Sequence, residues 1–431
     1  MKNSGNLGGP DLSRRDLLRT SSVAAVSSAI GTLVGACSRS PAAIAAGEQS
    51  GPVKLTSLLA PTERESKGAE TPLPPEDRVG FAIVGLGHLS IEQLLPAFGE
   101  CKASRPVALV SGHRDKALAV ANRYGIATKN IYDYQNFDKI KDNPAVSVVY
   151  IVLPNGMHAE YGIRASKAGK HVLCEKPMAV SVDECQRMIA AAKQADRLLM
   201  IAYRLQYEPH HRELIRMARA GELGKLKGFL SANGQNQGDP EQWRLKRALA
   251  GGGPLPDVGI YCINAARYLS GEEPLSVTAT SFRTPNDPRF EEVEEQLDFT
   301  LSFPSGFMAT CSSSYGYHNA KYMRLLGERG WAEMDPAFPY QGLRLVVSRK
   351  SDRAEQEERR QIDLGSKNHF ALEMDHMAEC VKNKKQPRTP GEEGLQDQRI
   401  ITALYQAAES GRRVELPRID QKDAFRGPPP T

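Results

Sequence analysis

A glycine-rich turn between an apolar run and an amphipathic stretch constrains the fold more than any other feature of the chain. Residues 79–84 are apolar and of strand length, residues 85–90 read G-L-G-H-L-S, and apolar residues then recur at helical spacing. The first glycine permits a tight turn, and the second lets a pyrophosphate approach a helix N-terminus. Ser90 replaces the usual third glycine, and Pro96 predicts a kink in the helix. The turn indicates a dinucleotide site at Gly85, Gly87, His88 and Leu89.

Strand-length runs and helical patterns alternate through the next part of the chain. Residues 114–124 are helical in pattern and end at Gly125, and Ser181 begins a capping box. The strand candidates are continuous apolar runs, as in strands buried on both faces, and lie at 107–110, 146–153, 171–174 and 198–202. This alternation predicts an α/β fold with a doubly wound parallel sheet.

The end of the second strand bears on which dinucleotide is expected. NAD sites usually place an acidic residue there to bind the ribose 2′-hydroxyl. This chain instead has Ser111, Gly112, Arg114 and Lys116. A hydroxyl and two cations suit a 2′-phosphate, so we favour NADP over NAD. Asp115 keeps NAD open, with the two cations as ordinary charges at a helix start.

Polar residues follow two later strands, where parallel sheets place their ligands. Pro154, Asn155 and His158 follow one strand, and Glu175 and Lys176 follow the next. We expect all five to contact the cofactor.

Asp257 and Tyr261 are four residues apart and would share one face of a helix. With Lys176 they form a candidate set for moving a proton. Tyr261 would accept the proton of a sugar hydroxyl, and Lys176 would polarise that oxygen and favour the phenolate. Asp257 would orient the substrate or the lysine. The spacing alone fits a surface lysine and a structural helix pair equally well.

Strand patterns gather again in the C-terminal half and predict a second, α+β domain. Helical patterns follow at 370–381 and 395–408, and these last helices could pack back on the first domain. The strand candidates are residues 275–282, 297–303, 307–313, 323–326 and 343–347. We divide the chain into residues 1–46, 47–76, 77–204 and 205–431.

The N-terminal segment, residues 1–46, resembles a Tat export signal. It has twin arginines at 14 and 15, followed by a mild apolar run too short to span a membrane. Cleavage could follow the alanines at 43, 45 and 46, or Cys37 could become a lipid anchor. Either way we expect a periplasmic protein. The proline-rich residues 47–76 would be a spacer or an arm that contacts a neighbouring subunit.

Charge and cysteine spacing exclude two classes of function. Five basic and two acidic residues of 1–46 contribute +3 to the formal charge of +5, which leaves +2 for the rest. Because the residues after 46 are close to neutral in total charge, a large nucleic-acid-binding surface is not expected. The seven cysteines show no zinc-ligand spacing, so we expect no metal site.

Many separated motifs resemble the Gfo/Idh/MocA oxidoreductase family, and most of all its glucose-fructose oxidoreductase branch. The similarity runs from about residue 77 to 415. The motifs are G-L-G, P-N-x-x-H-A from Pro154, Glu175-Lys176-Pro177, Gln242–Leu245, G-G-G-x-x-x-D-x-G-x-Y from Gly251 and Pro390–Gly394.

The resemblance implies roles for individual residues. Lys176, Asp257 and Tyr261 would be catalytic, with Tyr261 where most relatives have histidine. Ser111 and Lys116 would bind the 2′-phosphate. Further cofactor contacts would come from Arg204, Trp243 and Arg244, and further substrate contacts from Tyr203, Tyr207 and the polar residues 231–242.

The resemblance also implies a reaction. NADP would stay bound while an aldose such as glucose is oxidised at C1 to the lactone. The hydride would then pass to a second sugar, fructose or another aldose, to give an alditol by ping-pong turnover. A large open, mostly antiparallel sheet would form the interfaces of a homodimer or homotetramer.

Export and cofactor retention fit together. A Tat-type signal exports folded proteins, so a bound cofactor would travel with the chain and need two alternating sugars. An NAD-dependent glycosidase of the same family remains an alternative. Tyrosine at 261 and the missing acidic residue after the second strand argue against it. A non-catalytic sugar- or cofactor-binding protein would not require Lys176, Asp257 and Tyr261 together.

Overall fold

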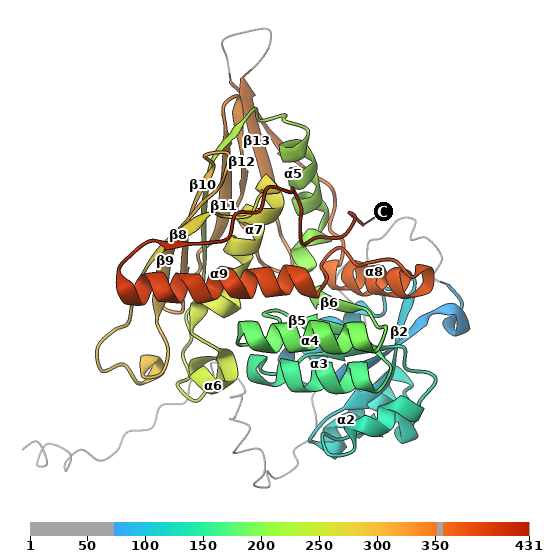
Figure 1. Ribbon diagram of the computed structural model, residues 1–431. Helices are drawn as coiled ribbons and strands as arrows, with labels where there is room; N and C mark the ends of the chain where they lie inside the picture. Colours follow the sequence, from blue (N-terminus) through green and yellow to red (C-terminus); the bar gives the residue numbers. More distant parts are fainter. Residues whose placement is uncertain (1–72, 351–356, 431) are drawn as a thin grey trace, which may run out of the picture. The chain divides into compact units, whose positions relative to one another are not determined.

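The computed structural model describes residues 73–350 and 357–430, which lie in one compact unit (Figure 1). The expected export signal, Cys37 and all of the arm up to residue 72 lie outside the described residues. The end of the arm enters one 3₁₀ turn, Pro75–Asp77. None of the helices in the described ranges combines the length and the apolar character needed to cross a membrane.

Six parallel strands form the first sheet, in the order β3-β2-β1-β4-β5-β6. They are β1 (Val79–Val84), β2 (Ser104–Val110), β3 (Ile131–Tyr132), β4 (Val148–Ile151), β5 (His171–Glu175) and β6 (Leu199–Ala202). The prediction of a doubly wound parallel sheet is confirmed. Strand order reverses between β1 and β4, so the carboxyl ends of these strands open onto a crevice where such folds bind ligands.

Helices cover both faces of this sheet. Phe81 and Ile83 of β1 pack in one core with α2 (Arg114–Tyr124) and α8 (His369–Asn383). Ala82 and Val84 point to the other core, with α3 (His158–Lys167) and α4 (Val182–Gln194). Because neighbouring strand residues face opposite sides, burial on both sides requires the continuous apolar runs seen in the sequence.

The helix after the glycine turn is shorter than its apolar pattern predicts. One π-helical turn, Ser90–Leu94, leads into α1 (Leu95–Ala97), which then ends. Pro96 lacks the N–H that a continuing α-helix would need. The change in helix type therefore falls one residue before the proline.

Nine strands form the second sheet, in the order β14-β13-β12-β11-β7-β10-β9-β8-β15. Among the strands in the described ranges, only the β7–β10 pair of this sheet is parallel. The strands are β7 (Leu226–Gly234), β8 (Ser276–Phe282), β9 (Gln296–Ser302), β10 (Met308–Ser314), β11 (Lys321–Gly327), β12 (Gly330–Met334), β13 (Leu345–Lys350), β14 (Glu357–Ile362) and β15 (Val414–Glu415). A mostly antiparallel sheet in an α+β domain was predicted, and this is confirmed.

The polar segment 231–242 was expected to line the substrate site, and its first part does not form a loop. Residues 231–234 end β7, a central strand paired with β10 and β11. Their polar side chains are satisfied within the domain: Ser231 donates to the Tyr322 carbonyl at 2.9 Å, and Asn233 donates to the Val258 carbonyl at 3.0 Å. The loop begins at Gln235.

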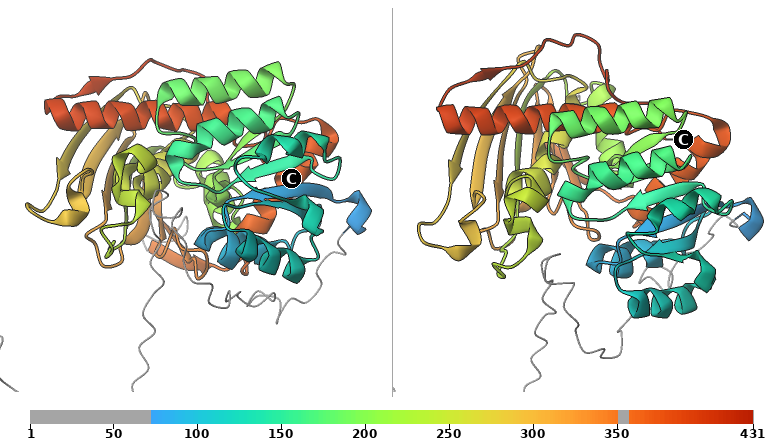
Figure 2. Two further views of the ribbon diagram at one scale, coloured as in Figure 1. Left: turned by 90° about the horizontal axis from the view of Figure 1, so that it is seen from below. Right: turned by 60° about the horizontal axis from the view of Figure 1, so that its bottom comes forward.

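One face of the second sheet is covered by helices, and the last of them also packs on the first domain. α7 (Ile260–Ser270) packs on β7 and β10, and α9 (Gly391–Ser410) packs on β8. Figures 1 and 2 show α9 running on beside α4. A side chain at Gly394 would lie 2.9 Å from Ile201 of β6, so this close approach requires glycine. The remaining helices are α5 (Pro209–Arg219) and α6 (Arg247–Ala250).

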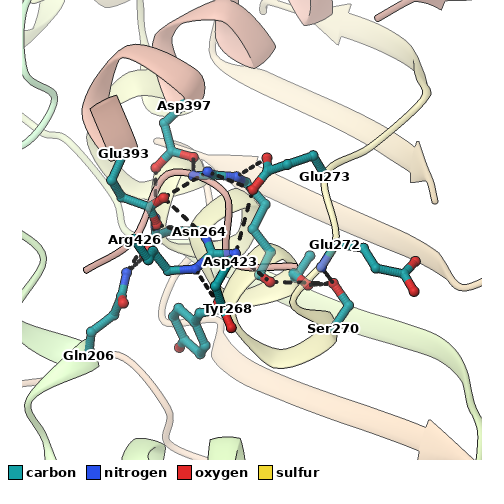
Figure 3. Close-up of polar contacts among 12 residues, drawn as sticks. Gln206, Asn264, Tyr268, Ser270, Glu272, Glu273, Glu393, Asp397, Asp423 and Arg426 are labelled. Atoms are coloured by element: carbon teal, nitrogen blue, oxygen red, sulfur yellow. Dashed lines mark hydrogen bonds and ion pairs between the residues drawn. The ribbon is translucent and has the colours of Figure 1, made fainter. Parts of the chain in front are cut away.

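A buried ionic cluster joins α7, α9 and the C-terminal tail (Figure 3). Arg267 of α7 pairs with Glu273 at 2.7 Å, Glu393 at 2.7 Å and Asp397 at 2.5 Å. Arg426 of the tail pairs with Glu393 at 3.0 Å, and these five side chains are fully buried. No feature of the sequence predicted this cluster.

Candidate active site

The glycine turn after β1 has the conformation that an approaching phosphate group requires. Gly85 has φ +94°, and a Cβ there would lie 2.3 Å from the Val152 carbonyl. Around Gly87 the space for a Cβ is open, so the backbone is accessible to a ligand. Ser90 donates to the Gly85 carbonyl at 2.6 Å, which holds the turn against the helix start. His88 is exposed and Leu89 half-buried beside it.

The residues expected at the 2′-phosphate lie together at the carboxyl end of β2, next to β1. The Ser111 side chain accepts the His113 backbone N–H at 3.1 Å. Gly112 and Arg114 are exposed, whereas Lys116 is half-buried and burial lowers the pKa of its ammonium. The site offers one hydroxyl and two cations, and no carboxylate lies on β2 itself.

Asn155 and His158, which follow β4, hold the site loops in place. Asn155 donates to the Ala250 carbonyl at 2.8 Å. His158 is fully buried, and its two ring nitrogens lie 2.8 Å from the Pro177 carbonyl and 2.9 Å from the Leu153 carbonyl. In this conformation His158 joins the loop after β4 to the loop after β5 and presents no free nitrogen to a cofactor. Pro154 lies half-exposed above it.

Lys176, at the end of β5, meets Asp257 from the second domain. The lysine Nζ donates to the Asp257 backbone carbonyl at 2.7 Å and to its Oδ1 at 3.1 Å. Their side chains are 11% and 13% exposed, so the pair is shielded yet reachable. Burial opposes the charged ammonium, but the acidic groups around it outweigh burial and raise the pKa of Lys176, with Tyr261 and Asp257 contributing most.

Two further side chains hold the other oxygen of Asp257. Arg244 donates to Oδ2 at 3.1 Å, and the Tyr315 hydroxyl donates to it at 2.9 Å. Burial alone would raise the pKa of Asp257, but Lys176 and Arg244 hold it well below its ordinary range. Asp257 is therefore a fixed carboxylate that orients its neighbours.

Tyr261 lies beside two cations. It is the second residue of α7, which follows the π-helical turn Leu255–Gly259 that carries Asp257. The Lys176 Nζ lies 4.9 Å from its ring centroid, and the Arg204 Cζ lies 5.0 Å from it. Lys176 is thus brought together with Asp257, 81 positions later in the sequence, and with Tyr261, where β5 meets the π-helical turn Leu255–Gly259 and α7.

Glu175, the last residue of β5, directly precedes Lys176 and is buried. It accepts the Tyr150 hydroxyl at 2.9 Å, and burial raises the pKa of its carboxyl despite the nearby lysine. Trp243 stacks on Arg244, with 4.6 Å between the guanidinium carbon and the ring centroid. Both lie in the 3₁₀ turn Trp243–Leu245 after β7, and Arg244 contacts Asp257.

Tyr203 and Tyr207 do not join this group. Tyr203 is buried close to Asp397 of α9, and burial and that charge raise its pKa well above the ordinary range. The Tyr207 hydroxyl bonds with the Thr389 hydroxyl at 2.9 Å, and its ring packs on His376. Both rings turn towards the C-terminal helices, so direct contact with a sugar at Lys176 is not possible in this conformation.

Three residues of the site had no sequence signal. Tyr315 bonds to Asp257, Tyr340 lies over Arg204, and Lys321 lies 3.5 Å from Gln235 at the rim. They come from the second sheet and its loops, at no fixed spacing from a motif. Within the described ranges no group of acidic, histidine or cysteine side chains could hold a metal ion.

Known proteins resemble the chain along most of its length. Residues 79–203 match the oxidoreductase family with the NAD-binding Rossmann fold, and residues 212–416 match the C-terminal alpha/beta domain of that family. A D-xylose 1-dehydrogenase [NADP(+)] from Haloarcula marismortui is 31% identical and covers 79% of this chain and 94% of its own. A D-glucoside 3-dehydrogenase from Escherichia coli is 26% identical and covers 78% and 97%.

A solved structure gives a stronger match. An aldose-aldose oxidoreductase from Caulobacter crescentus, complexed with glycerol, has a TM-score of 0.76 and 45% sequence identity. The match covers 79% of this chain and all of that one.

Proposed function

The chain belongs to the Gfo/Idh/MocA oxidoreductase family, and we propose that it oxidises an aldose at C1 to the lactone and reduces a second sugar to an alditol. The observation that carries the proposal is the meeting of Lys176, Asp257 and Tyr261 at the carboxyl edge of β5. This set can remove a proton from a sugar hydroxyl, and the named relatives are sugar dehydrogenases and an aldose-aldose oxidoreductase.

The residues of the chain divide the work of proton transfer. Lys176 donates a hydrogen bond to the reacting sugar oxygen and stabilises negative charge on it. Tyr261 takes the proton of that oxygen in the oxidising direction and returns it in the reducing direction. Asp257, fixed by Arg244 and Tyr315, holds the ammonium in place.

The residues at the carboxyl ends of β1 and β2 fit a dinucleotide with a 2′-phosphate. The open backbone at Gly87 admits a pyrophosphate, and Ser111, Arg114 and Lys116 offer a hydroxyl and cations to the phosphate. When bound, NADP supplies the acceptor for the hydride that leaves one sugar and the donor for the next. We propose NADP over NAD, held through turnover.

The second sugar is best proposed as another aldose. The relative with 45% identity is named for two aldoses, whereas fructose rests on the glucose-fructose resemblance alone. Alternation between two sugars also suits a cofactor that never leaves the protein. We further propose that the N-terminal segment directs the folded chain through the Tat machinery to the periplasm. Lipid attachment at Cys37 is the alternative to cleavage after the alanines.

The uncovered face of the second sheet supports self-association as a homodimer or homotetramer. Large apolar side chains are exposed on it at Leu230, Phe282, Met308 and Tyr322. A patch of this kind on a sheet commonly marks an interface. The Met308→Glu variant should lower the mass measured by light scattering.

One spectroscopic experiment tests the reaction. The full-length protein is purified, freed of small molecules by gel filtration, and followed in the near ultraviolet during addition of sugars. Glucose or xylose should raise the band of reduced nicotinamide, and a second aldose should remove it. Fructose forms a parallel arm. Absence of a bound nucleotide would overturn cofactor retention.

The other candidate functions give different outcomes in that experiment. Release of an aryl group from an aryl glycoside, with no net reduction of the nucleotide, would indicate a glycosidase. Sugar binding by calorimetry without any change in the nicotinamide band would indicate a binding protein.

A further inference from the structure

Lys321 is a half-buried cation at the start of β11, in the second sheet. It lies opposite Asn233 of β7, and residues opposite each other in antiparallel strands point to the same face. The Asn233 amide donates to the Val258 carbonyl at 3.0 Å, in the π-helical turn that also carries Asp257. The Lys321 side chain therefore points to the side of the sheet on which Asp257 lies.

The backbone of Lys321 also joins a residue next to the Tyr261 ring. The Ala337 N–H donates to the Lys321 carbonyl at 2.7 Å. The next residue, Phe338, packs on Tyr261 with 6.0 Å between the ring centroids. Lys321 is thus linked through one neighbour to the turn of Asp257, and through the other to the ring that packs on Tyr261.

Gln235 lies beside Lys321 at the end of the neighbouring strand. It directly follows β7, and its backbone N–H donates to the Ser314 carbonyl at 3.0 Å. The residue after Ser314 is Tyr315, whose hydroxyl donates to Asp257 at 2.9 Å. The Gln235 Oε1 lies 3.5 Å from the Lys321 Nζ. An amide and an ammonium therefore lie together, close to the side chains that hold Asp257.

Hydrogen-bonding groups of this pair remain available to a ligand. An ammonium has three donors, and a glutamine amide has two donors and an acceptor oxygen. Within residues 73–350 and 357–430, Gln235 is the only side chain that bonds to Lys321, and this bond is long. Burial and the charge of Arg204 lower the pKa of Lys321, whereas Asp257 opposes them. The ammonium is thus within electrostatic reach of the candidate active site.

We propose that Lys321 and Gln235 form a subsite that binds hydroxyls of the substrate sugar away from C1. The inference rests on the proposed function, in which Lys176 and Tyr261 take the oxygen at C1. The remaining hydroxyls then need partners on other elements, and small-molecule sites supply them from a few convergent polar groups. Because a sugar hydroxyl both donates and accepts, the glutamine oxygen can accept from one hydroxyl while the ammonium donates to its neighbour.

The pair fits a neutral sugar better than a sugar acid. An ammonium alone would also suit a carboxylate, but the Gln235 oxygen is an acceptor, as a carboxylate is, and the two do not bond. The substrate class is therefore a neutral aldose with adjacent hydroxyls. Polar groups placed for a hydroxyl reject an analogue that lacks it, because they would be left unpaired. The subsite selects the aldose that binds and takes no part in proton transfer.

The first measurement is binding without turnover. 1,5-Anhydroglucitol is glucose without its C1 hydroxyl, so it keeps the hydroxyls that the subsite binds and forms no lactone. Calorimetry with the full-length protein should give a Kd that Lys321→Met raises about tenfold or more, since a hydrogen bond to a charged group contributes this much. Gln235→Leu should raise the Kd less, and Lys321→Arg should restore part of the affinity. Circular dichroism shows whether each variant is folded.

The second measurement identifies the hydroxyl that contacts Lys321. The apparent second-order rate constant of cofactor reduction is compared for glucose and for its 3-deoxy, 4-deoxy and 6-deoxy analogues. In the wild type at least one analogue should react about tenfold more slowly or less. In Lys321→Met that penalty should disappear while any other penalty persists. A merely structural role of Lys321 would slow all four sugars alike and leave the penalty intact. Glucuronate, with a carboxylate at C6, should gain nothing over glucose.

Lys227→Met is the matched control, because Lys227 of β7 forms an exposed pair with Glu328 at 2.7 Å. Its affinity for 1,5-anhydroglucitol should stay at the wild-type value. The inference is overturned by an unchanged affinity in folded Lys321→Met, by absence of binding to the wild type, or by a preference for glucuronate that depends on Lys321. If no sugar reduces the wild-type cofactor while Lys321→Met still weakens binding, the proposed reaction fails and the subsite stands.

Discussion

The ammonium of Lys176 lies 2.7 Å from the backbone oxygen of Asp257 and 3.1 Å from its carboxylate. The lysine directly follows β5 of the first sheet, and the aspartate lies in the π-helical turn Leu255–Gly259 that leads into α7 of the second domain. The candidate site therefore exists only where the two domains pack together.

Asp257→Asn should slow cofactor reduction by the sugar about a hundredfold, within the range for loss of acid–base support. The amide keeps the shape of the side chain but no longer holds the ammonium by charge. Stopped-flow absorbance with glucose measures the rate. Asp183→Asn, in an exposed pair with Arg187, is the control and should change little. Equal rates in the two variants would remove Asp257 from the site.

Tyr261→Phe should retain bound cofactor and lose hydride transfer. The phenyl ring preserves packing on Phe338, while the hydroxyl that exchanges the proton is gone. Nucleotide content is measured after denaturation, and turnover by the nicotinamide band. Turnover within about tenfold of wild type, a difference of ~1.4 kcal/mol, would show that another group handles the proton.

Lys116→Ala should weaken the preference for NADP over NAD by about tenfold or more, since a charge-assisted contact to phosphate contributes about 1.5–3 kcal/mol. The nucleotide released by denaturation is identified by chromatography. Lys129→Ala, exposed in the same domain, should leave that nucleotide unchanged. If Lys116→Ala still retains NADP as wild type does, the 2′-phosphate does not bind there.

Arg426→Met should destabilise the protein by about 3–5 kcal/mol, because it leaves buried Glu393 and Glu273 with one arginine fewer (Figure 3). Urea unfolding of matched samples gives the difference. Arg418→Met breaks an exposed pair with Asp420 and should cost about 0–1 kcal/mol. Similar losses in both variants would contradict a special role for the cluster.

Stability should fall as pH falls from about 6.5 towards 4. Burial lowers the pKa of His171 and of His376 to about 4. Each accepts a backbone N–H, from Leu198 and Arg388 respectively. The unfolded chain binds protons at the ordinary pKa near 6.5, so acid in this window favours unfolding. Melting temperature against pH measures the slope.

His376→Gln should flatten that slope, whereas His318→Gln, at an exposed position, should preserve it. A melting temperature that stays constant or rises between pH 7 and pH 5 would contradict the prediction.

Sequence patterns predicted the strands and helices whose buried apolar residues recur at a regular spacing. Each strand of the first sheet except the two-residue β3 overlaps a continuous apolar run in the sequence. α2 begins and ends where its pattern predicts. β14 has no such apolar run: it is polar and exposed up to its half-buried last residue, Ile362, and backbone hydrogen bonds to β13 define it. β7 is built partly of small residues paired on both edges, which resemble a loop in sequence.

The sequence predicted those residues of the candidate site that belong to a recognisable motif. Lys176, Asp257 and Tyr261 meet, and the glycine turn is in place. Tyr315 and the environment of Arg204 could not be predicted, because side-chain contacts between separate elements leave no periodic trace. Tyr203 and Tyr207 flank Arg204 in sequence, but the chain turns sharply there and their rings point the other way.

The two buried arginines of the ionic cluster, Arg267 and Arg426, are 159 positions apart in the sequence. A nascent chain on the ribosome lacks Arg426 until 159 further positions have been added after Arg267. Until then Arg267 alone faces three acidic side chains, and the junction of α7 and α9 lacks its second cation. Folding of this region can finish only after Arg426 has left the ribosome, so translation products that stop before it would remain open to proteases.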